Sequence, residues 1–130
     1  MAPTIVPAYA AALALIYIFL ALRVIRSRQT ARVAIGTGGN AALARAIRVH
    51  GNFAEYVPLV LLLLALMQGW PPWWIHALCL SLVAARLVHA YGVSQEKENF
   101  QFRTVGMATT FFVLAASSLT LLGGALRLIG

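Results

Sequence analysis

Four long apolar stretches, separated by short polar or turn-forming segments, dominate the pattern of this chain. They cover residues 5–24, 41–68, 73–91 and 102–128. A helix needs roughly 20 predominantly apolar residues to cross a bilayer. The glycines between residues 36 and 39 and the Gly69-Trp70-Pro71-Pro72 run are typical of turns, and Asn40 is placed to cap the second helix. The pattern predicts an all-α, integral membrane four-helix bundle of up-down-up-down topology, formed as a single domain by residues 1–130.

The second stretch is unusual because polar side chains interrupt its first half. Arg48, Asn52 and Glu55 fall within about 60° of one another on a helix, and Glu55 lies roughly 10 Å deeper than Arg48. A carboxylate at that depth is costly unless it is paired, and it normally faces the bundle interior at a functional site. We expect its partner to be Arg86 of the third stretch, which shares a helix face with His89.

The composition agrees with a protein that lies in the membrane. Hydrophobic residues make up 62% of the chain and charged residues 10%, whereas about a quarter of the residues in a soluble domain are charged. The net charge of +7 does not indicate a nucleic-acid partner, because the basic residues lie mostly beside the apolar stretches. The single cysteine, Cys79, cannot build a disulfide framework or a paired-cysteine metal site.

The distribution of basic residues predicts the orientation of the bundle. They gather after the first and third stretches, as Arg23, Arg26, Arg28, Arg32, Arg45, Arg48, Lys97 and Arg103. The positive-inside rule then places these two loops in the cytoplasm and both termini on the other side of the membrane. No Lys or Arg precedes Arg23, and the first stretch is too long for a signal-peptide core, so we expect it to be retained as a span.

A carboxylate, an amide, a histidine and several arginines are thus expected to meet at the cytoplasmic side. Arg103 opens the fourth stretch at the same level. Arginines bind carboxylates bidentately and a glutamate can accept an amine, so the set suits a small anionic or zwitterionic ligand. An arginine beside a thiol lowers the pKa of that thiol. These residues indicate a peptide-like or thiol cofactor presented to lipid-soluble substrates. His50 and His89 lack a third ligand with which to hold a metal.

At these positions the sequence resembles the MAPEG family, the membrane-associated proteins in eicosanoid and glutathione metabolism. The resemblance rests on Arg48-x-x-x-Asn52-x-x-Glu55-Tyr56-x-Pro58, on Ala85-Arg86-Leu87, and on Arg103 at the start of the fourth stretch. It implies a homotrimer of four-helix bundles in a bacterial inner membrane, with glutathione bound as co-substrate between protomers near the cytoplasmic side. The activity it implies is that of a transferase or peroxidase acting on lipophilic electrophiles.

The resemblance also implies roles for individual residues. Glutathione would be held by Arg48, Asn52, Glu55, Tyr56, Arg86 and His89, with Arg28 and Arg32 at basic positions of the first loop. Arg103 would stand near the thiol and stabilise the thiolate, which makes it the expected catalytic residue. Members of the family often carry tyrosines three and seven residues after the third-span arginine; here those positions are His89 and Val93.

Two other functions stay open on this sequence. One is a small four-span transporter that uses Glu55 as a proton or cation relay; the other is a non-catalytic MAPEG-like protein that binds a lipid or another anion. Purely structural roles are also open. Glu55 and Arg86 can join helices as a buried pair, and Arg48 can extend to the membrane interface. Topology is the expected role of Arg23, Arg26 and Arg45.

Overall fold

The computed structural model describes residues 5–129, and all regular secondary structure in that range is helical. The helices are α1 (Ile5–Ala31), α2 (Ala41–Leu66), α3 (Pro72–Ser94) and α4 (Phe100–Ile129). Each is long and apolar enough to cross a membrane. The prediction of an all-α protein with four membrane-length helices is confirmed. α1 continues past residue 24 to Ala31, because arginines favour helix and the apolar run marks the edge of a bilayer, not the end of the helix.

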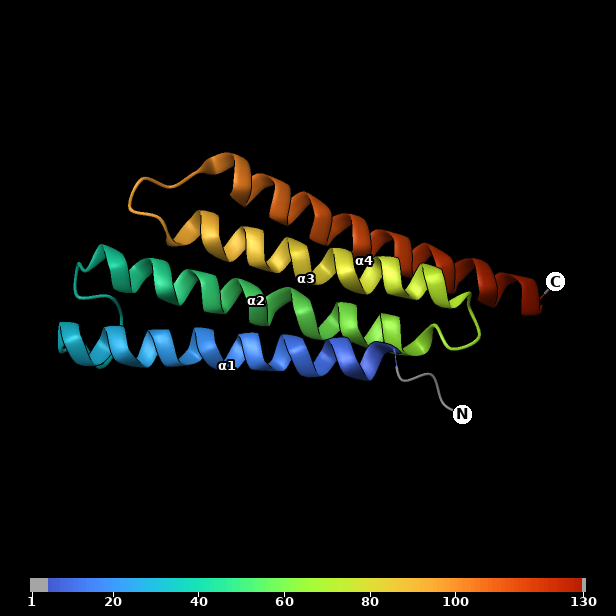
Figure 1. Ribbon diagram of the computed structural model, residues 1–130, viewed down its shortest axis with the longest axis horizontal. Coiled ribbons are helices and arrows are strands. Elements are labelled where there is room, and N and C mark those ends of the chain that lie inside the picture. The colour runs from blue at the N-terminus through green and yellow to red at the C-terminus, as the bar shows by residue number, and fades with distance from the viewer. Residues whose placement is uncertain (1–4, 130) are drawn as a thin grey trace.

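Viewed as in Figure 1, the helices run lengthwise in chain order; α1 also contacts α3 and α2 also contacts α4, so they form a bundle and not a flat row. The α1–α2 and α3–α4 loops lie together at one end, and the α2–α3 turn lies at the other end with the start of α1 and the end of α4. α1 packs mainly on α2, and α3 packs mainly on α4. α1 and α4 do not contact each other within the described chain. α2 and α3 contact each other and both outer helices, and the outward side of α2 that carries Glu55 is exposed; we call this side the open flank of α2.

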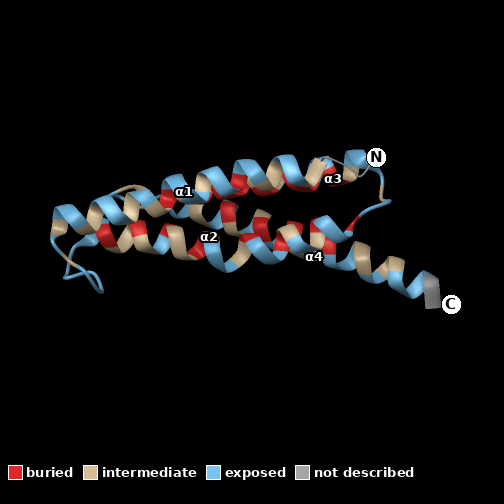
Figure 2. Cartoon of the chain, turned by 90° about the horizontal axis from the view of Figure 1, so that it is seen from below, coloured by how far each residue is buried: buried red, intermediate tan, exposed pale blue. Residues whose placement is uncertain are grey.

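The core is a narrow strip along the inner faces of the helices (Figure 2). Phe53, Val57, Val60 and Leu64 supply the α2 part of this strip at helical spacing, and Cys79 of α3 is fully buried beside them. Large apolar side chains also cover the outside: Leu15 is 69% exposed, Leu80 60% and Leu119 67%. A soluble protein rarely shows such a continuous apolar surface. The outer surface therefore suits contact with lipid.

A side-chain cap begins α2, and two glycines allow α3 and α4 to pack closely. The side chain of Asn40 accepts a hydrogen bond of 2.9 Å from the backbone nitrogen of Leu43, which confirms the predicted cap of α2. α3 and α4 approach closely at two glycines. A Cβ on Gly106 would lie 2.6 Å from the Cβ of His89, and a Cβ on Gly92 would lie 3.0 Å from the backbone nitrogen of Arg103. This close packing places Arg103 beside Gly92 and Gly106 beside His89.

Candidate functional site

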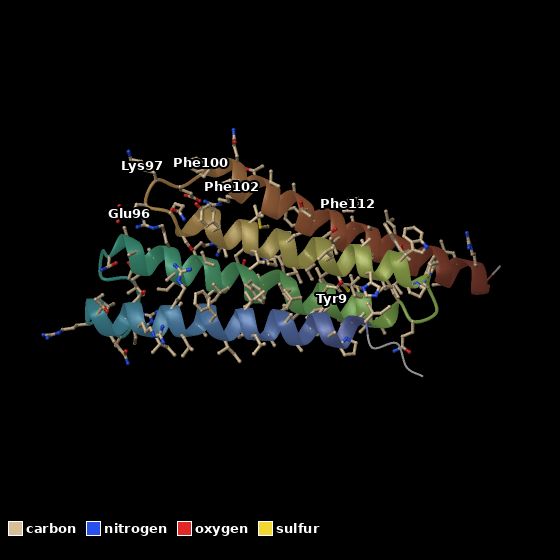
Figure 3. The ribbon with its side chains drawn as sticks, viewed as in Figure 1. Tyr9, Glu96, Lys97, Phe100, Phe102 and Phe112 are labelled. Atoms are coloured by element: carbon tan, nitrogen blue, oxygen red, sulfur yellow. The ribbon has the colours of Figure 1, made fainter. Side chains whose placement is uncertain are left out.

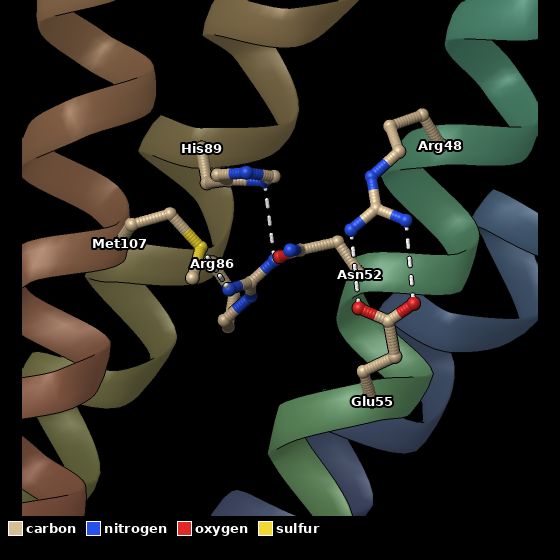
Figure 4. Close-up of polar contacts among 6 residues, drawn as sticks. All are labelled: Arg48, Asn52, Glu55, Arg86, His89 and Met107. Atoms are coloured by element: carbon tan, nitrogen blue, oxygen red, sulfur yellow. Dashed lines mark hydrogen bonds and ion pairs between the residues drawn. The ribbon is translucent and has the colours of Figure 1, made fainter.

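A buried arginine joins three helices near the loop end of the bundle (Figure 4). Arg86 of α3 is 1% exposed. One terminal nitrogen of its guanidinium donates to the Oδ1 of Asn52 on α2 at 2.5 Å and to the Nδ1 of His89 at 3.1 Å. The other donates to the Oγ1 of Thr110 on α4 at 3.4 Å. An arginine has only donors, so the Nδ1 of His89 must be the acceptor.

The partners of Arg86 are all neutral. No carboxylate contacts its guanidinium within residues 5–129, and its Nε has no hydrogen-bond partner in that range. The aromatic face of Phe53, whose centroid lies 5.9 Å from the guanidinium carbon, gives a cation–π contact instead. Arg86 is thus a buried cation held by dipoles, which is a costly arrangement unless the surroundings satisfy its donors.

The predicted ion pair between Glu55 and Arg86 is wrong. Glu55 pairs with Arg48 of its own helix, through oxygen–nitrogen contacts of 3.1 and 3.3 Å. The two residues lie two turns apart on one face, and the long arginine side chain spans the rise between them. The geometry is bidentate (Figure 4), and the side chains of Arg48 and Glu55 are 50% and 51% exposed. The carboxylate therefore points to the open flank of α2, away from the core.

The polar stripe of α2 thus divides between the core and the open flank. Asn52 is 5% exposed and reaches inward to Arg86, while Arg48 and Glu55 lie on the flank beside it. Tyr56 continues the stripe, and its ring meets that of Phe111 on α4 edge to face, with centroids 5.4 Å apart. An ion pair on the outer side of a membrane-length helix would face lipid unless another chain or a ligand covers it.

Arg103, the predicted catalytic residue, lies at the start of α4 and not on α2. The Nη1 of Arg103 contacts the Oε1 of Glu98 at 2.7 Å, with side chains 43% and 25% exposed. Arg103 lines an open pocket of about 430 Å³ with Phe100, Thr104, Met107, Ala108 and Phe111. The sulfur of Met107 lies 3.8 Å from the Nη1 of Arg86. Two residues of the pocket wall therefore contact other site residues: Met107 contacts Arg86, and Phe111 contacts Tyr56.

Figure 3 places this region along the molecule. Glu96, Lys97, Phe100 and Phe102 lie around the α3–α4 loop, and Tyr9 lies toward the opposite end. At that opposite end Tyr9 contacts the Nδ1 of His76 at 3.2 Å, which ties α1 to α3. The predicted site residues of α2, α3 and α4 all lie toward the end of the bundle that holds the α1–α2 and α3–α4 loops, or near its middle.

The two remaining predicted site residues, Arg28 near the end of α1 and Arg32 just after it, lie elsewhere. Arg28 donates to the backbone carbonyls of Gly36 at 2.9 Å and Val33 at 3.3 Å, so it holds the first loop closed. Arg32 is exposed and has a left-handed backbone, with φ of 54°. Arg23 contacts Ser94 at the end of α3, and Arg28 lies about 7.5 Å further along α1. A ligand contact from Arg28 or Arg32 stays a prediction, and within one chain neither joins the Arg48–Glu55 pair.

Sequence reasoning missed several contributors to the site. Thr110 and Met107 contact Arg86, and they follow Arg103 at spacings of seven and four residues. That spacing marks one face of a helix and was a usable signal. Glu98 lies in the loop, and nothing in its sequence position indicates a contact with Arg103.

Comparison with known protein families gives a match that covers the whole of this site. A model of the MAPEG family matches residues 6–123. Two relatives, both named inner membrane protein YecN, come from Escherichia coli strain K12 and from Escherichia coli O6:H1 strain CFT073. Each is 38% identical over 108 residues, which cover 82% of this chain and 81% of the relative. The range matched by the family model includes every site residue described above from Tyr9 to Phe111.

Proposed function

The chain belongs to the MAPEG family, and on that premise we propose that it is a glutathione-dependent transferase or peroxidase that acts on lipophilic electrophiles within a bacterial inner membrane. The observation that carries the proposal is the Arg48–Glu55 pair, a half-exposed pair of opposite charges on the open flank of a membrane-length helix. Such a pair is costly against lipid, and a polar ligand of matching charge would relieve that cost.

Glutathione has the complementary chemistry. It carries carboxylates that an arginine binds bidentately, and an ammonium that a glutamate accepts. Arg48 and Glu55 would exchange their mutual contact for contacts with the ligand. Asn52 and Tyr56 lie beside them on the same stripe. The Arg86 network holds Asn52 in place from the inside.

Arg103 would act on the thiol. Arg103 lines the pocket whose wall includes Phe111, the residue that contacts the ring of Tyr56. A positive charge there stabilises a thiolate over a thiol. In a transfer reaction the thiolate sulfur forms a bond to the electrophilic carbon, and the displaced group leaves with the bonding electron pair. The surrounding apolar residues would admit a lipophilic acceptor from the bilayer.

We further propose that the working unit is a homotrimer of up-down-up-down bundles with the loops 32–40 and 95–99 in the cytoplasm and the termini on the other side. Two observations support assembly. The charged flank of α2 is open in the single chain, and Arg28 and Arg32 lie away from that flank. A neighbouring copy would cover the flank and supply basic residues to it. The positive-inside rule supports the orientation.

The test is a glutathione titration of the purified protein in detergent, with the thiolate absorbance of the bound ligand followed at the same time. We expect wild-type protein to bind glutathione and to conjugate a lipophilic electrophile. Arg103→Ala should lower the conjugation rate roughly 100-fold, as loss of a charge-stabilising donor does in other enzymes, while glutathione affinity changes much less. Arg127→Ala removes an exposed arginine at the far end of α4 and is the matched control.

Three results would separate the alternatives. Absence of both glutathione binding and activity would refute the proposal. Binding without a thiolate band or conjugation would indicate a MAPEG-like binding protein. Binding of a different low-molecular-weight thiol in a parallel titration would keep the site and change its cofactor.

A further inference from the structure

Most of the acidic residues of this chain form ion pairs with arginines of the candidate site. The sequence has only three acidic residues. Glu55 contacts Arg48, and Glu98 contacts Arg103. Glu96 is exposed in the loop before α4. Two of three carboxylates thus neutralise the two partly exposed arginines of the site, and the second of these pairs involves the residue proposed to stabilise the thiolate.

The Glu98–Arg103 contact is built into the start of α4. The backbone nitrogen of Gln101 donates to the side chain of Asn99 at 3.0 Å, and that of Arg103 donates to the Asn99 carbonyl at 3.2 Å. Gly92 of α3 packs against the Arg103 backbone on the other side. The carboxylate is the more sheltered partner, with 25% exposure against 43% for the arginine. Backbone on both sides of the pair is therefore fixed.

We propose that Glu98 is a positioning residue that holds the Arg103 guanidinium at the edge of its pocket and limits how strongly that guanidinium stabilises a bound thiolate. The inference rests on the proposed function and adds a residue that tunes its reaction. The holding effect comes from the 2.7 Å contact. The limiting effect comes from charge, because a carboxylate beside Arg103 repels a thiolate that approaches the same cation.

Glu98→Gln separates the two effects. The amide oxygen of glutamine can still accept from the guanidinium, so the contact is kept while the negative charge is removed. Removal of one nearby like charge should lower the pKa of the bound glutathione thiol by about one unit. Glu98→Ala removes the contact as well and releases Arg103. The pKa of the bound glutathione thiol should therefore fall less in Glu98→Ala than in Glu98→Gln.

Other charged groups face the same region and must stay constant in the test. Arg86 and His89 come from α3, and Arg48 and Glu55, already paired, come from α2. Tyr91 of α3 packs edge to face on Phe102, beside Arg103. None of these contacts Glu98 among the described residues. A shift that appears on changing Glu98 alone is therefore attributable to its own charge.

The experiment follows thiolate absorbance against pH at saturating glutathione in wild type, Glu98→Gln, Glu98→Ala and Glu96→Gln. Glu96→Gln removes an exposed carboxylate from the same loop and is the control. We expect the midpoint to fall by about one unit in Glu98→Gln and to stay at the wild-type value in Glu96→Gln. Glu98→Ala also removes the charge and should still lower the midpoint, though by less, so it tests the limiting effect if the glutamine variant does not fold.

Two failures are distinguishable. A wild-type protein without any thiolate band overturns the proposed function and this inference with it. If wild type shows a thiolate band but the titration midpoint of Glu98→Gln equals or exceeds that of wild type, the inference alone is overturned. Equal midpoints in Glu98→Gln and Glu98→Ala overturn the holding role of the contact.

Discussion

The closest approach of α3 and α4 gives a prediction that does not depend on the ligand. Gly106 faces α3, and a Cβ at that position would lie 2.6 Å from the His89 Cβ, 2.9 Å from the His89 Cα and 2.8 Å from the Ala85 carbonyl oxygen. Two of these neighbours are backbone atoms and the third is a Cβ, so none can rotate away. Gly106→Ala must therefore move α4 away from α3.

The size of the effect follows from opposing contributions. Overpacking of a close interface costs about 1–3 kcal/mol. Alanine in place of glycine within a helix contributes about 0.5–1 kcal/mol in the other direction. Because none of the three neighbours can rotate away, the upper end of the overpacking range, about 2–3 kcal/mol, applies. The net loss is then about 1–2.5 kcal/mol, which corresponds to a melting temperature lower by roughly 4–9 °C for a chain of this size. The displacement also reaches His89, so the hydrogen bond from Arg86 should weaken at the same time.

The chain carries its own reporter for the measurement. Cys79 is the single cysteine and is fully buried in the core. A maleimide dye that fluoresces on reaction with a thiol should label it only as the protein unfolds. Heating wild type and Gly106→Ala in the same detergent with this dye gives both midpoints.

Gly123 supplies the matched control, because a Cβ there would meet nothing within 4 Å. Gly123→Ala should melt at or slightly above the wild-type temperature. If Gly106→Ala melted at or above wild type while Gly123→Ala behaved as expected, the close approach of α3 and α4 would be wrong.

The remaining predictions use the same reporter or the first loop. Asn52→Ala removes the carbonyl acceptor from a buried guanidinium and should destabilise the protein by about 2–3 kcal/mol; Asn52→Asp restores an acceptor with a charge, and failure of Asn52→Ala to lower the melting temperature would contradict the assigned network. Arg28→Ala removes two contacts to loop carbonyls, and a loss of about 1 kcal/mol should raise the rate of tryptic cleavage after Arg32 about five-fold. An unchanged cleavage rate would show that Arg28 does not hold this loop.

The apolar pattern was enough to predict the four helices, because lipid leaves few alternatives to the helix for a backbone that must satisfy its own hydrogen bonds. Asn40 also revealed the start of α2, since its side chain caps the first turn. The end of α1 could not be read from hydropathy. The apolar run ends near Val24, but the helix continues through Arg26 and Arg28 until the glycine-containing loop begins.

The partner of Glu55 was missed for a geometric reason. A stripe of about 60° is wide enough for one edge to face the core while the other faces outward. The sequence gives the width of the stripe but not its rotation about the helix axis. In the structure Asn52 takes the inward edge and the contact with Arg86, so Glu55 is left to the arginine two turns before it.

The pairing of Glu55 with Arg48 instead of Arg86 determines where the net charge of the site lies, and this bears on the proposed chemistry. Arg48 and Arg103 each have a carboxylate partner, and Arg86 has none within residues 5–129, so the five side chains together carry one positive charge, held at Arg86. Glutathione with a protonated thiol carries one negative charge, which this surplus can match. Ionising the thiol adds a second negative charge, and the cation proposed to meet it is Arg103, already neutralised in part by Glu98. The arrangement would therefore favour binding over ionisation, and the strength of the Glu98–Arg103 contact would set how far thiolate formation proceeds at neutral pH.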